Sequence, residues 1–360
     1  MEKRKRSVVR RIVDILLVVL LVVALLLAAG IAYLSVTEYK PADRETMVID
    51  GKGSRTLSVG DSLTVLSWNI GYGALGDNAD FFMEGCEMVE TADEARVQEN
   101  LKCIAKGINK VSPDITLLQE VDSDSTRSHH VDETAYLDGL WSDDVSTEAL
   151  YHAGFVPYPV PPIGTVHMNL QTLSKYPASE ATRIQLPVPF KWPIRTANLK
   201  RCLLVTRIPL KGSDKDLVTV NLHLEAYDDG EGKAAQTKML RELLESEYKK
   251  GNYVIAAGDF NQSFSNVDMT DYAIREGVWA PGVLDVSDFS NDFLLRMDNT
   301  TPTCRGLDQP YAGVPEDSVQ YYMVDGFIVS KNLKIDSLKT QDYGFKNTDH
   351  NPVVLEATLA

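Results

Sequence analysis

Cysteine is scarce in this sequence, which limits the ways in which the fold can be cross-linked. Four residues, Cys86, Cys103, Cys202 and Cys304, occur among 360, and no two of them form a C-x-x-C pair. Such wide spacing is typical neither of a zinc cluster nor of a dense disulfide framework. We expect buried free thiols, with a single disulfide as the alternative.

Several catalytic motifs are also missing. The sequence contains no G-x-S-x-G motif and no P-loop, so a serine hydrolase and a nucleoside triphosphatase lack their usual signatures. Only six histidines occur, without paired His/Cys spacing, which disfavours a zinc hydrolase. No internal repeat is visible, so a solenoid or propeller is not expected.

Basic residues are fewer than acidic residues in this sequence. The net charge is −15, and without the first 34 residues, which carry six Lys/Arg and two Asp/Glu, it becomes −19. A surface this acidic repels polyanions, so nucleic acid is a disfavoured partner.

One long segment has no charge at all. The twenty residues Ile15–Leu34 are apolar and, as a helix, span roughly 30 Å, the thickness of the hydrocarbon core of a bilayer. The six Lys/Arg before this segment favour a cytoplasmic N-terminus. We predict a cytoplasmic basic segment (1–11), a transmembrane helix (12–34), a tether (35–62) and one extracytoplasmic domain (63–360). The small residues at 28–30 leave a cleaved signal peptide as the alternative. The basic flank and single span look bacterial.

The remaining chain reads as alternating strands and helices. Mostly antiparallel strands with interspersed amphipathic helices predict two sheets packed face to face, with helices outside. Residues 72–93 and 122–164 are expected to be long, irregular polar loops. The strands are expected at Leu63–Ile70, Ile115–Val121, Lys200–Leu210, Leu217–Leu224, Tyr253–Phe260, Val324–Ser330 and Pro352–Thr358, and the helices at Glu94–Val111 and Lys233–Lys250.

Polar side chains recur at the ends of these apolar strands. They are Asn69, Glu120, His223, Asp259, Asn261, Asp325, Asp349 and His350. A buried carboxylate or imidazole is costly unless it is paired or bound to a metal. Taken singly, each has a structural explanation, such as a strand-end cap, an Asx turn or a core histidine. Together they predict that the strand ends converge on one polar cleft.

The chemistry of this set suits hydrolysis at phosphorus. Carboxylate and amide oxygens are hard ligands that suit Mg²⁺, Mn²⁺ or Ca²⁺. Histidine can transfer protons near neutral pH or stabilise the negative charge of a phosphate. The sequence therefore predicts a metal-dependent phosphoesterase.

Six motifs in a fixed order carry a resemblance to a known family. From about Thr64 onward, the chain resembles the endonuclease/exonuclease/phosphatase superfamily, whose fold is a four-layer α/β/β/α sandwich (DNase I-like) with its site at one end of the paired sheets. The motifs are Ser67-Trp68-Asn69, Gln119-Glu120, His223-Leu224, Gly258-Asp259-Phe260-Asn261, Val324-Asp325-Gly326 and Thr348-Asp349-His350.

The resemblance also implies a role for each motif residue. Glu120 would be the principal metal ligand, with Asn69 beside it and Asp349 as a further ligand or support. His350 would be the general base and Asp325 would orient it. Asp259 and Asn261 would position water and phosphoryl oxygens, and His223 would hydrogen-bond the phosphate or assist the leaving group.

Three further positions bear on substrate. Gly71 stands where the AP endonuclease branch has an Asp two residues after the strand Asn. Asn169 loosely resembles a family Asn before a strand and is a candidate for substrate binding. Arg127 could clamp a substrate phosphate or could be a solvated loop arginine.

Three functions follow as hypotheses. The first is a monomeric, membrane-held phosphoesterase acting on a phosphodiester or phosphomonoester, either a lipid head group or a small phosphoester. The second is a surface nuclease, for which a basic rim would offset the acidic surface. The third is a catalytically silent module that binds a phosphorylated ligand. The rim would comprise Arg183, Lys191, Arg195, Lys200 and Arg201.

Overall fold

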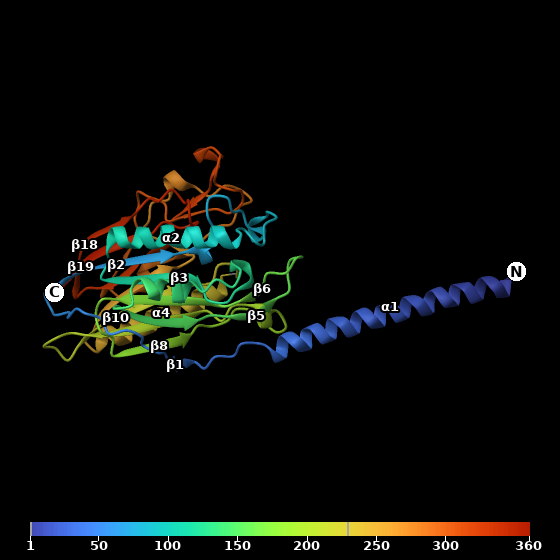
Figure 1. Ribbon diagram of the computed structural model, residues 1–360, viewed down its shortest axis with the longest axis horizontal. Helices are drawn as coiled ribbons and strands as arrows, with labels where there is room; N and C mark the ends of the chain where they lie inside the picture. Colours follow the sequence, from blue (N-terminus) through green and yellow to red (C-terminus); the bar gives the residue numbers. More distant parts are fainter. Residues whose placement is uncertain (1, 229) are drawn as a thin grey trace.

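Two sheets stack face to face and helices cover their outer surfaces (Figure 1). The structure, a computed structural model, describes residues 2–228 and 230–360, with the side chains of residues 2–7 excepted. The side chains of Lys3 to Arg6, on which part of the predicted basic segment rests, therefore lie outside the described residues.

The first sheet has seven strands in the order β1-β8-β9-β10-β11-β17-β14. All neighbours are antiparallel except β10 and β11. Its strands are β1 (Arg44–Thr46), β8 (Glu180–Gln185), β9 (Cys202–Pro209), β10 (Asp216–His223), β11 (Tyr253–Asp259), β17 (Asp325–Ser330) and β14 (Phe293–Arg296).

The second sheet has six strands in the order β18-β19-β2-β3-β7-β4. Only β2 and β3 are parallel within it. Its strands are β18 (Leu333–Thr340), β19 (Val353–Leu359), β2 (Ser62–Asn69), β3 (Ile115–Asp122), β7 (Met168–Ser174) and β4 (Val145–Leu150).

Short elements complete the domain. Three small pairs are β5 (Ala153–Val156) with β6 (Gly164–Val166), β12 (Gln262–Phe264) with β13 (Gly282–Leu284), and β15 (Cys304–Arg305) with β16 (Tyr321–Tyr322). The helices are α2 (Glu94–Val111), α3 (Glu133–Leu140) and α4 (Glu231–Lys249), and the 3-10 turns are η1 (Gly71–Gly73), η2 (Phe82–Glu84), η3 (Thr126–Ser128), η4 (Ile194–Ala197), η5 (Thr270–Tyr272), η6 (Val286–Asp288) and η7 (Glu316–Ser318).

Three hydrophobic layers hold the stack together. Apolar residues of both sheets, such as Val65 and Ile255, form a common core between the sheets. Leu240 and Leu244 of α4 pack on the outer face of the first sheet, and Leu101 of α2 packs on that of the second. Helix, sheet, sheet and helix therefore form the predicted four layers.

Helix α2 shows how local sequence sets the bounds of an element. The Asp93 side chain accepts a hydrogen bond from the Arg96 backbone amide (2.8 Å) and caps the first turn. Apolar residues recur at helical spacing and are buried. Ser112 adopts a left-handed conformation and Pro113 follows, so the helix ends at Val111.

Helix α1 (Glu2–Val36) projects away from the domain (Figure 1). Its segment Val8–Val36 contains an 18-residue window with a mean hydropathy of 3.3 and is long and apolar enough to cross a membrane, as an anchor or a signal sequence is. Its leucines and valines are exposed.

The segment expected to be a tether contributes to the fold. Within residues 35–62, β1 pairs with the edge strand β8, and the buried Leu57 forms a bridge with Leu210. The ordered domain therefore begins well before residue 63. The sequence predicts a tether here because the short strand β1 lies among glycines and charged residues.

The expectation of an irregular loop over residues 122–164 was wrong. This stretch contains α3, β4 and β5. Strand β4 carries polar residues that are nevertheless buried, since Thr147 hydrogen-bonds Thr206 of the facing sheet (3.0 Å). The four cysteines are free thiols as expected, but Cys86 and Cys103 are only partly buried.

Candidate active site

The strand register explains why the polar residues meet. His223 at the end of β10 lies beside Asp259 at the end of β11, and Asp259 lies beside Asp325 of β17. In the facing sheet, Asn69 ends β2 opposite Gln119 of β3. Parallel strands end at the same edge of a sheet, so both sheets deliver their polar ends to one place.

Asn69 connects the two sheets at this place. Its side-chain amide donates to Glu120 Oε1 and to Asp259 Oδ2, each at 3.1 Å, while its Oδ1 accepts from the Gly71 amide (3.0 Å). The ligand role implied for Asn69 stays a prediction. The geometry shows that the buried side-chain amide of Asn69 hydrogen-bonds two carboxylates and so holds them together.

His350 is oriented by a buried carboxylate. Its Nδ1 lies 2.8 Å from Asp325 Oδ2, and its Nε2 lies 3.8 Å from Asp259 Oδ2. Burial lowers the pKa of His350, but Asp325, Cys304 and Asp349 together outweigh it and raise that pKa well above its ordinary value. Asp325 therefore stabilises the protonated form of the imidazole.

Tyr151 fixes the proton on His223. The tyrosine hydroxyl accepts a hydrogen bond from the Glu120 amide (3.0 Å) and lies 3.2 Å from His223 Nδ1, to which it can then donate. This arrangement leaves the His223 proton on Nε2, which lies 3.5 Å from Asp259 Oδ2. Burial and the neighbouring Arg201 lower the pKa of His223, so the ring is a neutral donor.

The backbone is strained at two residues of this cluster. Glu120 has a φ of 54° and Asn261 a φ of 50°, in the left-handed region that few non-glycine residues adopt. The side-chain amide of Asn261 donates to Leu224 O (2.9 Å), and its backbone amide donates to Asp259 Oδ1 (2.8 Å). Strain of this kind persists only where surrounding contacts enforce it and is common at functional sites.

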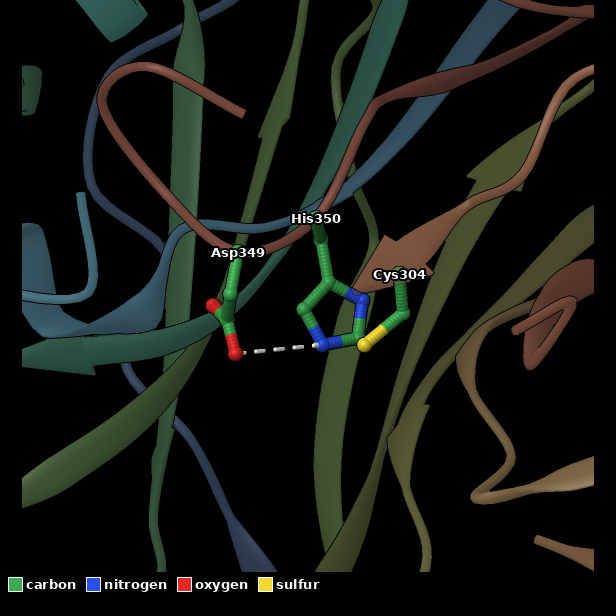
Figure 2. A group of neighbouring side chains, drawn as sticks. All are labelled: Cys304, Asp349 and His350. Carbon is green, nitrogen blue, oxygen red and sulfur yellow. Dashed lines mark ion pairs between the residues drawn. The ribbon is translucent and has the colours of Figure 1, made fainter. Parts of the chain in front are cut away.

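Asp349 and Cys304 flank the His350 ring on opposite sides (Figure 2). Asp349 Oδ2 lies 4.0 Å from His350 Nε2. Burial raises the pKa of the Cys304 thiol to about 12, so the sulfur stays protonated near neutral pH. A Cβ at Gly71 would lie 2.9 Å from Asp349 Oδ1. The space that a side chain would fill at position 71 is thus taken by Asp349.

Arg127 is not a solvated loop arginine. Its guanidinium makes two 3.1 Å hydrogen bonds to the buried Asp122 and stacks on the Tyr72 ring at 3.5 Å. It also lines the cavity at the site. Its role in clamping a substrate phosphate stays a prediction.

Asn169 lies apart from the cluster. Its side chain donates to Val121 O (3.2 Å) and to Ser123 Oγ (3.1 Å), and it is not among the described residues that line the cavity. The structure therefore brings together every predicted site residue except Asn169, whose substrate-binding role stays a prediction.

Three of the five residues predicted to form a basic rim are buried in the interior. Arg183 is fully buried and donates to Leu150 O (2.8 Å), and Arg201 is buried beside Glu225. Lys200 is buried beside Glu38. Only Lys191 and Arg195 are exposed, because the other three cations are needed to satisfy buried carbonyls and carboxylates.

The donor set fits a hard divalent cation. Burial raises the pKa of Glu120, Asp349 and Asp259, that of Asp259 to about 7, and neighbouring carboxylates raise those of Glu120 and Asp259 further. Asp325 Oδ1 is buried without a hydrogen-bond partner among the described residues. A cation among these oxygens would relieve the repulsion, and oxygen ligands suit Mg²⁺, Mn²⁺ or Ca²⁺. Glu120, Asp349 and Asp259 could hold it.

Comparisons with known proteins agree with this geometry. The model of the Endonuclease/Exonuclease/phosphatase family matches residues 66–342. The chain belongs to the endonuclease/exonuclease/phosphatase family. Its members are hydrolytic phosphoesterases and nucleases and generally depend on a divalent metal, so membership supports phosphoesterase or nuclease activity. A comparison with curated proteins found no match.

Solved structures confirm the predicted DNase I-like fold. An endonuclease/exonuclease/phosphatase from Beutenbergia cavernae matches with a TM-score of 0.55 at 19% identity, over 83% of this chain and 72% of its own. One from Bacteroides vulgatus matches with 0.53 at 14% identity, over 83% and 100%. The human Nocturnin catalytic domain matches with 0.51 at 18% identity, over 87% and 98%. These likenesses concern the fold.

Proposed function

We propose that this family member is a membrane-anchored, metal-dependent phosphoesterase that hydrolyses a phosphodiester or phosphomonoester outside the cytoplasm. Its substrate is a lipid head group or a small phosphoester. The observation that supports this most is the convergence of Glu120, His223 and the Asp325–His350 pair on one cavity. Attack of water on phosphorus needs a base, donors to the phosphate and a place for a cation, and this cavity supplies all three.

The base is His350. Asp325 accepts a hydrogen bond from His350 Nδ1–H, which directs Nε2 toward the other site residues. In the neutral form of the ring, which a divalent cation beside it would favour, Nε2 can remove a proton from water. As the water attacks phosphorus, the imidazolium that forms is stabilised by the Asp325 carboxylate.

The phosphate is held by neutral donors. His223 offers its Nε2 proton to a phosphoryl oxygen or to the leaving group, and Tyr151 keeps the proton on that nitrogen. Asp259 and Asn261 position water and phosphoryl oxygens, and Arg127 lies at the cavity wall where it can add positive charge. A divalent cation bound to Glu120 and its neighbours would act as a Lewis acid on a phosphoryl oxygen.

The proposed location is supported by α1 and the positive N-terminal flank. A single span with a cytoplasmic N-terminus would put the domain, which we propose to be monomeric, at the outer membrane surface. The acidic domain suits lipid or small substrates better than a polyanion.

A surface nuclease is the second candidate, because family membership supports nuclease activity as well. Burial of Arg183, Lys200 and Arg201 removes most of the basic rim on which it would depend. A catalytically silent binding module is the third, and the hydrogen bond between His350 and Asp325 counts against it.

The test offers several phosphoesters to the full chain in detergent micelles. Bis-p-nitrophenyl phosphate, p-nitrophenyl phosphate, plasmid DNA and sphingomyelin are each supplied with Mg²⁺, Mn²⁺ or Ca²⁺ and, in parallel, with EDTA. Metal-dependent turnover that Glu120→Gln abolishes and the exposed control Glu356→Gln retains would support the proposal. A folded protein without turnover in any combination would favour the binding module, and preference for plasmid DNA the nuclease.

A further inference from the structure

The cavity at the active site is much less polar than its catalytic residues suggest. It has a volume of about 320 Å³ and extends from Glu120 and His350 to a second side that we call the apolar wall. This wall comprises Val156, Ile163, Val166, Met168, Phe190 and Leu199. A phosphate needs none of these side chains. They suit a hydrocarbon group attached to the phosphoester, because burial of apolar surface is favourable wherever water is displaced.

Large apolar side chains at the outer edge of the apolar wall are exposed to solvent. Tyr158 and Val160, in the tip between β5 and β6, are 68% and 93% exposed, and Trp192 and Ile194, before and within η4, are 58% and 65% exposed. We call these four residues the rim. Isolated exposed hydrophobics need no explanation, but a group of them beside an apolar cavity marks an interaction surface.

One residue of the rim, Trp192, lies against the end of the membrane helix. Trp192 Nε1 donates to Ser35 Oγ in the last turn of α1 (3.0 Å). Just beyond it, Tyr39 stacks edge-on with His152 beside β5 (5.4 Å). Figure 1 shows α1 leaving the domain at the end where β5 and β6 lie. Trp192 therefore lies at the end of the domain from which α1 leaves.

The connection between α1 and the domain is fixed rather than loose. The Glu38 side chain is almost fully buried and forms ion pairs with Lys200 (3.5 Å) and Arg195 (3.4 Å). These two cations lie on either side of the short segment that contains Leu199 of the apolar wall. The exposed Lys191 and Arg195 flank Trp192 and can attract anionic head groups. Tryptophan and tyrosine are the residues typical of a membrane–water interface.

We propose that the rim is seated in the membrane surface, and that the cavity takes an amphiphilic phosphoester directly from the bilayer. The apolar wall holds the hydrocarbon part while the phosphate reaches Glu120, His223 and His350. This inference rests on the proposed phosphoesterase for the substrate, whereas the seating of the rim is independent of catalysis.

Fluorescence quenching tests the position of the rim. The full chain is reconstituted into phosphatidylcholine vesicles with brominated acyl chains, which quench tryptophans at the interface. The fraction of fluorescence that is quenched should fall in Trp192→Phe and should not fall in Trp141→Phe, whose tryptophan donates to Asn109 (3.1 Å) near the start of β4. Equal quenching in the wild type and Trp192→Phe would overturn the seating of the rim.

A substrate series tests the cavity. Ethyl and octyl p-nitrophenyl phosphate, both below their aggregation concentrations, are hydrolysed by the full chain in vesicles without bromine. Each buried methylene can contribute up to about fourfold, so kcat/KM should be at least about tenfold higher for the octyl ester. Ile163→Asn should reduce that ratio, and the exposed control Val59→Asp, at the opposite end of the sheets, should not.

The outcomes separate the two proposals. Equal rates for the two esters would refute the hydrocarbon site while leaving the phosphoesterase intact. Turnover of neither ester would refute the phosphoesterase and with it the amphiphilic substrate, and the quenching result would still decide the position of the rim.

Discussion

Tyr151→Phe is the substitution that most directly tests how the active site is held. The change removes one hydroxyl from a residue that is 1% exposed and leaves its ring in place. Two hydrogen bonds are lost, one from the Glu120 amide and one to His223 Nδ1. A buried donor without a partner costs about 1–3 kcal/mol, so Tm should fall by roughly 3–10 °C on the scale of a large domain.

Activity should fall for a separate reason. Without the hydroxyl, the His223 proton is free to occupy either nitrogen, and the strained Glu120 loses its amide partner. The net value of each hydrogen bond is about 0.5–1.5 kcal/mol, and 1.36 kcal/mol corresponds to tenfold. We therefore expect kcat/KM for bis-p-nitrophenyl phosphate to fall about 10- to 100-fold, measured well below the lowered Tm.

A double-mutant cycle shows whether Tyr151 acts through His223. In the background of His223→Ala, Tyr151→Phe should cost clearly less activity than it does in the wild type. The matched control is Tyr253→Phe, which removes a hydroxyl that donates to Ala360 O (2.8 Å) at the far end of the sheets and should leave activity unchanged. Full activity of Tyr151→Phe, or strictly additive losses, would refute the reasoning.

Three further substitutions give distinct outcomes. Burial and the neighbouring Asp138 raise the pKa of Glu148 from its ordinary 4.5 to about 7, so the fold loses stability as the pH rises through this range. Glu148→Gln should therefore stabilise the protein by about 1–2 kcal/mol at pH 8, after allowance for solvent screening, and by little at pH 4, as seen by calorimetry. Gly71→Ala should displace Asp349 and raise the Mg²⁺ concentration for half-maximal turnover at least about tenfold, whereas an unchanged Mg²⁺ titration would contradict the crowding at this position. Asp325→Asn should lower kcat about 10- to 100-fold with a smaller change in KM, because a charged hydrogen bond that holds the base is lost; steady-state kinetics on protein with an unchanged circular dichroism spectrum tests this.

Much of the fold was predictable where hydrophobic pattern and local signals agree. Helix α2 was predicted with its observed bounds because a regular apolar stripe ends before Pro113-Asp114, and the structure adds the Asp93 cap and the left-handed Ser112 at its two ends. The strands that build the common core are apolar on the face between the sheets. By contrast, β7 reads MNLQTLS and is buried throughout, because side chains such as Gln171 find partners in neighbouring elements. Composition alone does not show such partners.

The main polar residues of the candidate site were also predictable from the sequence, whereas the residues that support them were not. Carboxylates and imidazoles at the ends of apolar strands stand out in the sequence, and strand ends at one edge must meet. The supporting residues do not stand out. Tyr151 belongs to a stretch that was expected to be irregular, and Arg201 was expected at the surface although it lies buried beside Glu225. Their roles depend on contacts between segments far apart in the chain.

The close attachment of α1 has a kinetic consequence. Glu38 and Tyr39 fasten the stretch between α1 and β1 to the domain. If α1 anchors the protein and the substrate is an amphiphile in the bilayer, as proposed, the active site is held at a constant position relative to the membrane and finds its substrate by lateral diffusion. The rate would then depend on the mole fraction of substrate among the surrounding lipids rather than on the bulk concentration. Diluting the substrate with inert lipid should slow the reaction even when the total amount in the sample is constant.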